Sequence, residues 1–403
     1  MLDESLDPAV LAVLPPGSEV VDVHEHGTAS WSSGYKVDVE VDGEEKEYFL
    51  KVLQRHNHVE MARGEYESQK ALAEILPDNV AVPLAFGTFQ LDSSKSFFIT
   101  PFRELMDKIA TPTALAELLK TLHTTSRSPT GKFGFHVQTF NGVVPVINDW
   151  CDSWEAWFTR QFKADILWEQ SVCGRDPEFD AVADEFFAKV IPRLLRPLET
   201  GGRSIKPSLL HGDIWHGNCQ IDADTQKVIL FDSCCCYGHN ELDLHMMREP
   251  RYKFSEKQRH LIEYKRIVGV SEPVEDFDDR NALYAMRDNI INSGLHEHRR
   301  FLRQKVKEEM QRLLAKYPEG FEGFKRSRGS EYPSKPRPGK EKLLCAILWV
   351  TALLALVTSY YVATLGRPFE VIKFPSSHQG PKLDFAIPED KAMEEGVDDI
   401  VIG

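Results

Sequence analysis

The chain has 403 residues, enough for two or three hydrophobic cores, and 42% of them are hydrophobic and 27% charged, as in globular proteins. Its net charge of −14 argues against a nucleic-acid partner, whose phosphates would require a basic face. The N-terminal run MLDESLDPAV lacks the basic-then-apolar pattern of a secretory signal, and the seven cysteines are interpreted as small apolar residues of a reducing compartment. We therefore expect a cytoplasmic main body.

Residues 1–101 predict a small, mainly β lobe with one helix. Residues 36–43 alternate polar and apolar side chains and end in an Asp-Gly turn, and 48–53 resume as a second strand, so the two form a hairpin. Helix formers with apolar residues at helical spacing run from His58 to Leu76 and stop at a proline. Residues 97–99 predict another short strand.

Helices dominate beyond this point, and residues 102–322 are expected to form a larger, mainly helical lobe. The predicted helices span residues 113–123, 152–170, 180–195 and 278–309. The chain is therefore expected to be α+β and two-lobed.

Three further segments are expected after the helical lobe. Residues 323–342 form a basic linker rich in Pro and Gly, and residues 366–403 form an acidic tail. Between them, residues 343–365 contain no charge and are long enough to predict a transmembrane helix, a single-pass anchor with its N-terminal side in the cytoplasm. A buried helix of a soluble domain, or foreign sequence joined by a mistaken gene model, are the alternatives.

One lysine of the predicted small lobe suits a role with nucleotide phosphates. Lys51 lies in an apolar strand, and a carboxylate on the next helix could hold its ammonium group. Glu65 and Glu67 both lie there but point to different sides of the helix, and Glu65 is favoured. The Gly- and Ser-rich run from 26 to 34 is a candidate phosphate loop at Gly27 and Ser30, although such a run is also ordinary in a hairpin.

Residues 211–232 carry the strongest chemical signal. Asp213 and Asn218 are five positions apart on one loop, and a short apolar strand then leads to Asp232. Phosphoryl transfer from ATP requires a carboxylate beside the acceptor hydroxyl, and an amide and a second carboxylate to hold Mg²⁺. Asp213 is therefore the predicted base, and Asn218 and Asp232 are the predicted metal ligands. A polar turn with buried hydrogen bonds is the structural alternative.

Three blocks of sequence resemble the fructosamine-3-kinase / ketosamine-3-kinase family. Leu209-Leu210-His211-Gly212-Asp213-Ile214-Trp215 with Gly217-Asn218 is similar to its L-L-H-G-D-L-W-x-G-N, and Phe231-Asp232 followed by Tyr237-Gly238-His239-x-Glu241 is similar to a second motif. The third block is the more diagnostic; its residues are Lys132-Phe133-Gly134-Phe135-His136, Gly142, Pro145, Asn148, Trp150 and Trp154. The resemblance spans roughly residues 20 to 315.

This resemblance implies a protein-kinase-like fold and ATP- and Mg²⁺-dependent phosphorylation of the 3-hydroxyl of ketosamines. The acceptors would be ribulosamine or fructosamine adducts on protein lysines or on small amines, so that the reaction serves glycation repair. The resemblance implies for Asp213, Asn218, Asp232, Lys51 and Glu65 the roles given above. Trp215 is a candidate wall for the sugar, with a core position as its alternative, and Asn148 of the third block is assigned to the acceptor site.

The sequence departs from the family pattern at several positions. The family's Asp-Pro-Ala is here Asp232-Ser233-Cys234, a Gln of the third block is Val146, and an expected Phe-Gly-Gly-Phe-like run is absent. None of these changes removes a group that the chemistry requires, but they leave the sugar open. A related small-molecule kinase with a choline-like or aminoglycoside-like acceptor, and a membrane-tethered pseudokinase scaffold, are the alternative functions.

Overall fold

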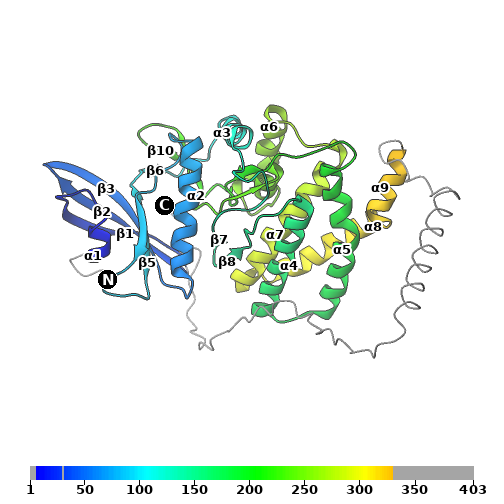
Figure 1. Ribbon diagram of the computed structural model, residues 1–403, viewed down its shortest axis with the longest axis horizontal. Coiled ribbons are helices and arrows are strands. Elements are labelled where there is room, and N and C mark those ends of the chain that lie inside the picture. Colours follow the sequence, from blue (N-terminus) through cyan, green and yellow to red (C-terminus); the bar gives the residue numbers. More distant parts are fainter. Residues whose placement is uncertain (1–5, 30, 330–403) are drawn as a thin grey trace, which may run out of the picture. The chain divides into compact units, whose positions relative to one another are not determined.

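The computed structural model describes residues 6–29 and 31–329. The small lobe is a five-stranded antiparallel sheet in the order β1-β2-β3-β5-β4, with helix α2 packed beside it (Figure 1). Its elements are α1 (Pro8–Leu11), β1 (Glu19–Ala29), β2 (Ser32–Val41), β3 (Glu44–Leu53), α2 (His58–Ile75), β4 (Ala85–Thr88) and β5 (Ser96–Pro101).

Strands β2 and β3 form the hairpin that was predicted from the alternation of polar and apolar residues. Val37, Val39 and Val41 are buried, while the intervening side chains face outward. Asp42 and Gly43 both have positive φ, at 54° and 79°, as a tight two-residue hairpin turn requires. Helix α2 also lies where it was predicted, and ends before Pro77.

The larger lobe is mainly helical, as predicted, and its helices gather on one side of α2 (Figure 1). The α-helices are α3 (Pro112–Thr125), α4 (Trp154–Cys173), α5 (Pro177–Leu195), α6 (Arg259–Ile267), α7 (Phe277–Leu295), α8 (Phe301–Lys316) and α9 (Gly320–Arg328). Short 3₁₀ helices are η1 (Arg196–Glu199), η2 (Asn240–Met247), η3 (Lys253–Gln258), η4 (Val274–Asp276) and η5 (Glu297–Arg299).

Small antiparallel sheets complete this lobe. β10 pairs with both β11 and β6, β9 pairs with β12, and β7 pairs with β8. These strands are β6 (Leu105–Met106), β7 (Thr139–Asn141), β8 (Val144–Val146), β9 (Ser208–Leu210), β10 (Cys219–Asp222), β11 (Val228–Leu230) and β12 (Cys236–Gly238). The loop between β9 and β10 and the one between β11 and β12 carry the residues that the sequence singled out.

The single helix predicted over residues 278–309 is two helices, α7 and α8. The chain leaves helical geometry at His296, where φ is −130° and ψ is 116°. Just before it, Gly294 packs so closely on Trp168 that an added Cβ would lie 2.4 Å from the indole ring. Helix α9 runs to Arg328, so that residues 323–328 of the expected linker are helical.

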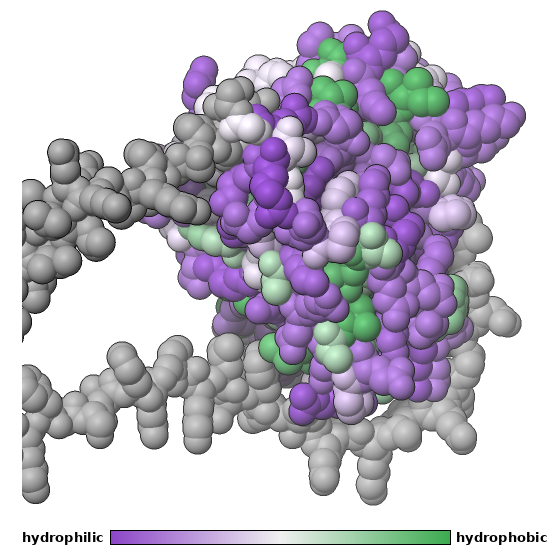
Figure 2. All heavy atoms as spheres, turned by 90° about the vertical axis from the view of Figure 1, so that its right-hand side faces the viewer, coloured by the Kyte–Doolittle hydropathy of each residue, from purple (hydrophilic) through white to green (hydrophobic). Residues whose placement is uncertain are grey.

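The prediction of a transmembrane helix over residues 343–365 is corrected. No helix of the described residues is long and apolar enough to cross a membrane, and residues 343–365 themselves lie outside that part, as do 330–342 and the acidic tail. The long helices that are described carry charges along their length; α5, for example, includes Asp184, Lys189 and Arg193. The helical end of the molecule presents a mostly hydrophilic face with a few separate apolar spots (Figure 2).

Candidate active site

Lys51 stands at the centre of an ion-pair network that joins the two lobes. Its Nζ lies 3.0 Å from Glu65 of α2 and 2.8 Å from Oδ1 of Asp232, which follows β11. The side chains of Lys51 and Glu65 are only 12% exposed, whereas that of Asp232 is 46% exposed. Glu67, the competing carboxylate, instead accepts a hydrogen bond from His136, at 3.0 Å. The network therefore leaves one face of the Asp232 carboxylate open.

Asp213 and Asn218 are joined directly across the loop between β9 and β10. The Asn218 amide nitrogen donates to Oδ2 of Asp213 at 2.7 Å and to its backbone carbonyl at 3.1 Å. Because the nitrogen faces Asp213, the amide oxygen is left for a different partner. The Phe231 backbone nitrogen donates to the Asn218 carbonyl at 3.3 Å, which brings the Asp232 segment next to this loop.

The loop between β9 and β10 is fixed by hydrogen bonds to Asp243 of η2, a residue that the sequence analysis missed. Its buried carboxylate accepts hydrogen bonds from the backbone nitrogens of His211, at 2.9 Å, and Gly212, at 2.8 Å. His123 of α3 contacts the same carboxylate at 3.0 Å. The available signal was an acidic residue within a largely apolar run, Leu242 to Met247, although spacing alone would not have identified its partners.

His211 fixes the backbone on both sides of the site. Its Nδ1 accepts from the Asp213 backbone nitrogen at 3.2 Å, so the neutral ring carries its proton on Nε2 and donates to the Phe231 carbonyl at 3.0 Å. Burial lowers the pKa of His211, which favours this neutral form. The imidazole is thus a spacer between the Asp213 and Asp232 loops.

The carboxylates of the site differ in proton affinity. Burial, followed by repulsion from Asp288 and Asp232, raises the pKa of Asp213 to about 8. Burial also raises the pKa of Glu65, to about 7. Burial opposes ionisation of Asp232 as well, but the Lys51 ammonium outweighs it and lowers the pKa of this carboxyl. Asp232 is therefore the more strongly acidic of the two partners of Lys51.

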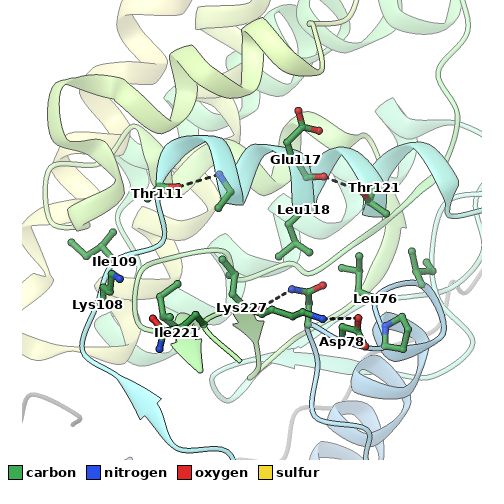
Figure 3. Close-up of a pocket in the computed structure, with 16 residues that line it drawn as sticks. Leu76, Asp78, Lys108, Ile109, Thr111, Glu117, Leu118, Thr121, Ile221 and Lys227 are labelled. Atoms are coloured by element: carbon green, nitrogen blue, oxygen red, sulfur yellow. Dashed lines mark hydrogen bonds and ion pairs between the residues drawn. The ribbon is translucent and has the colours of Figure 1, made fainter. Parts of the chain in front are cut away.

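The Lys51 network and Asp213 line a narrow cleft of about 80 Å³, whereas Asn218 is not among the lining residues. Sequence reasoning missed its apolar wall, formed by Trp31 after β1 and by Phe140 and Gly142 of the β7–β8 hairpin; the remaining lining residues are Lys51, Leu53, Met61, Glu65, Asp213, Asp232 and Ser233. A larger cavity, of about 620 Å³, lies elsewhere, between the end of α2, α3 and the β10–β11 turn (Figure 3). Because it contains none of the network's charged groups, we place the candidate chemistry in the smaller cleft.

The structure brings together some of the predicted residues and separates others. Trp215 adjoins the Asp213 loop, partly exposed, with its ring 5.8 Å from that of Tyr252. Asn148 is buried away from the cleft lining, where its amide nitrogen donates to the Val137 carbonyl and to Thr139 Oγ1, both at 2.9 Å. Gly27 is in β1 with φ of 82°, beside an irregularity in the pairing with β2, and Ser30 lies outside the described residues.

The donor set can be compared with what a divalent cation requires. Among the described residues there is no cluster of three or more His, Cys, Asp or Glu side chains that could hold a metal ion alone. A Mg²⁺ ion bound with a nucleotide needs only one or two protein oxygens, since phosphates and water complete its shell. The open carboxylate of Asp232 and the free amide oxygen of Asn218 fit that requirement.

Comparisons with known proteins agree on one family. The model of the fructosamine kinase family matches residues 19–316. A rice (Oryza sativa subsp. indica) chloroplastic protein-ribulosamine 3-kinase is 30% identical over 189 residues, which are 46% of this chain and 52% of the relative. Mouse (Mus musculus) ketosamine-3-kinase is 36% identical over 116 residues, 28% of this chain and 34% of the relative. The chain thus spans about half of the rice protein and less of the mouse protein.

The fold is shared with a solved structure as well. A crystal structure of a protein from Thermobifida fusca, provisionally named a fructosamine-3-kinase, superposes with a TM-score of 0.60 at 17% identity. The match covers 77% of this chain and 100% of that one. At this identity the likeness establishes the two-lobed fold.

Proposed function

Because the chain belongs to the fructosamine kinase family, we propose that it is an ATP-dependent kinase that phosphorylates the 3-hydroxyl of ketosamines. Its acceptors are ribulosamine or fructosamine adducts on protein lysines or small amines, with ribulosamine slightly preferred. The observation that carries the proposal is the convergence of Lys51, Asp213 and Asp232 on one cleft, with Glu65 and Asn218 hydrogen-bonded to them. The names of the rice and mouse relatives, a ribulosamine 3-kinase and a ketosamine-3-kinase, support this acceptor class.

Each group of the cleft has a task in this reaction. The Lys51 ammonium binds phosphate oxygens of ATP, and Glu65 keeps this ammonium in place. Asp232 is then available to bind the cation that accompanies the nucleotide. Asp213 accepts a hydrogen bond from the acceptor hydroxyl, aligns it with the terminal phosphorus and takes its proton late, as the bond to the leaving group breaks. Trp215, beside Asp213, offers an apolar face to sugar C–H groups.

Asp232 and Asn218 are the oxygen donors that would hold Mg²⁺ in this site. A cation there would neutralise the charge that develops on the phosphates. It would also screen Asp213 from the negative charge of Asp232, which otherwise raises the pKa of Asp213. Burial and repulsion from Asp288, the larger causes of the raised pKa of Asp213, would remain, so the cation would ease ionisation of the base only in part.

The test is turnover by the purified full-length chain with ATP and Mg²⁺. A ribulosamine-modified lysine, a fructosamine-modified lysine, choline and an aminoglycoside are offered separately, and phosphorylated product is identified by mass spectrometry and its position by NMR. We expect a ketosamine 3-phosphate. Turnover of choline or the aminoglycoside alone would assign a different acceptor class, and nucleotide binding without any turnover would support the scaffold alternative.

The matched variant is Asp213→Asn, which keeps the shape of the side chain and removes the base. We expect kcat to fall by about a thousandfold, a typical loss for a general base, while ATP binding changes little. Full activity in this variant would show that Asp213 is not the base.

A further inference from the structure

Ser233, one of the departures from the family pattern, has a specific partner in the fold. Its hydroxyl donates to Oε1 of Gln69 at 3.1 Å, and both side chains are buried, at 5% and 2% exposure. The family's proline at this position has no side-chain donor. The hydrogen bond is therefore a feature of this chain and not of the motif.

Gln69 also contacts the backbone on the N-terminal side of Asp232, whereas Ser233 lies on the C-terminal side. Its Nε2 donates to the Leu230 carbonyl at 3.2 Å. The side-chain amide of Gln69 thus contacts both Leu230, just before Phe231-Asp232, and Ser233, just after it. Ser68, the neighbouring residue of α2, adds a third tie by accepting a hydrogen bond from the Cys235 backbone nitrogen at 3.0 Å.

These ties come from the same helix that carries Glu65. Positions 65, 68 and 69 are spaced i, i+3 and i+4, so their side chains lie on one face of α2. That face therefore holds the Lys51 ammonium through Glu65 and the Asp232 segment through Ser68 and Gln69. Asn79, shortly after α2, adds a contact to β11, because the Leu230 nitrogen donates to its carbonyl at 2.8 Å.

The segment needs such support because its conformation is unfavourable by itself. Asp232 has φ of 53°, in the left-handed region that costs a non-glycine residue about 1 kcal/mol or more. Its side chain is also the most exposed of the Lys51 network, so little packing fixes the carboxylate directly. Hydrogen bonds to the flanking residues are what hold it in register with Lys51.

We propose that Gln69 and Ser233 are positioning residues that clamp the segment around Asp232 to helix α2, so that its carboxylate is presented to a divalent cation. The proposal rests on the proposed function, in which Asp232 binds that cation with the nucleotide. Loosening the clamp lowers the gain in nucleotide affinity that the cation provides more than it lowers affinity for the nucleotide alone.

The experiment measures binding of ADP to the full-length protein by calorimetry, with and without Mg²⁺. The ratio of the two dissociation constants is the cation-dependent gain in affinity. We expect this gain to fall about tenfold in Ser233→Ala and in Gln69→Ala, and to stay near the wild-type value in Ser233→Thr, which keeps the hydroxyl. The double variant should lose about as much as Gln69→Ala alone, because Ser233→Ala breaks a hydrogen bond that Gln69→Ala already removes, whereas Gln69→Ala also removes the bond to Leu230.

The control is Ser293→Ala, which removes another buried hydroxyl hydrogen bond, that from Ser293 to Glu169 at 2.8 Å. It should lower the melting temperature without changing the cation-dependent gain. The clamp is refuted if Ser233→Ala and Gln69→Ala keep the full gain, or if their losses simply add.

A second measurement uses neither nucleotide nor metal. Amide hydrogen exchange at residues 231–236 should accelerate in Ser233→Ala relative to the wild type, and stay unchanged in Ser293→Ala. Unchanged exchange there would also refute the clamp. If the wild type shows no Mg²⁺-dependent ADP binding, the proposed function fails, and the exchange experiment still decides whether the clamp exists.

Discussion

At the scale of single residues, Gly212 shows how the Asp213 loop depends on space beside the backbone. Its φ is 87°, and an added Cβ would lie 2.4 Å from the Cys234 carbonyl oxygen. Gly174 has nearly the same φ, 84°, but no atom within 4 Å of an added Cβ. The two glycines therefore separate the cost of the backbone angle from that of the contact.

We predict that Gly174→Ala lowers the free energy of unfolding by about 2 kcal/mol, because its φ of 84° and ψ of 152° lie in a region that is essentially restricted to glycine. Gly212→Ala should cost at least about 2 kcal/mol more, because the Cys234 carbonyl must move, and it should abolish turnover by displacing Asp213. Urea unfolding of both variants provides the comparison. Equal losses would mean that the loop and the Cys234 segment separate easily.

A second prediction at this scale concerns Trp215, whose place in the site the sequence proposed. Its ring packs over Gly217, where an added Cβ would lie 2.4 Å from the indole, and it remains partly exposed beside Asp213. Trp215→Ala should raise the KM for a ketosamine about tenfold and leave the KM for ATP unchanged, since in the proposed site only the acceptor would contact the indole. Trp215→Phe should recover most of the affinity. A rise in both KM values would point to a collapsed loop.

The candidate site residues that could be identified from the sequence are those that lie at a characteristic spacing within one short segment. Asp213, Asn218 and Asp232 lie within twenty residues of one another, and the β11 strand between them is visible as an apolar run. Asp243 and Gln69 could not be found in this way, because their partners are set by packing between distant elements. A buried carboxylate or amide carries no periodic signal that names its partner.

At the scale of elements, the helices and the hairpin with clear periodicity were predicted well, and of the short strands in the larger lobe only β11 was predicted. The strands β6 to β12 have two to four residues each, too few for alternation to stand out. The break between α7 and α8 was missed because Gly294 lies in an otherwise helical pattern, and the Trp168 ring that packs on it comes from α4. Tertiary contact overrode the local preference at that point.

For helix α9 we predict a substitution that lowers stability without changing activity. Phe324 is buried at 5% exposure, and the Arg193 guanidinium of α5 lies 4.4 Å from its ring centroid. Phe324→Ala should lower the free energy of unfolding by about 3 kcal/mol, through lost burial and cavity formation. We expect kcat and both KM values to be unchanged, because α9 contributes nothing to the cleft lining. The exposed neighbour Glu322 is the control, and Glu322→Ala should cost less than about 0.5 kcal/mol.

At the scale of the whole molecule, the larger lobe is built around α7, a helix that is buried on nearly all sides. Such a helix must bring its polar side chains into the core with partners, and Arg280 pairs with Glu241 at 2.8 Å, as Arg287 does with Asp165 at 2.5 Å. The sequence predicted the two lobes from the strand and helix patterns along the chain. It did not predict that buried ion pairs lie at the centre of the larger lobe, because a helix such as α7, with charged residues on every face, is normally predicted to be exposed to solvent.

The same buried polar core makes the stability of the molecule depend on pH through His239. The Tyr284 hydroxyl accepts a hydrogen bond from the Trp154 indole at 2.9 Å and therefore donates its own proton to His239 Nδ1, at 2.8 Å. The neutral imidazole then donates from Nε2 to Ser271, also at 2.8 Å. Burial lowers the pKa of His239 from 6.5 to about 4, although nearby Glu241 opposes the shift.

The sign of the effect follows from which state binds the proton first. Below pH 6.5 the unfolded chain protonates this histidine, whereas the folded protein keeps it neutral until about pH 4. The free energy of unfolding should therefore be unaffected by His239 at pH 8 and fall between pH 6.5 and 4, by at most about 3 kcal/mol from this residue. In His239→Gln that part of the slope should disappear, even if the variant is less stable at every pH. Urea unfolding at half-unit pH steps measures the slope, with exposed His298→Gln as the control, and a wild-type slope in His239→Gln would show that other groups cause the acid destabilisation.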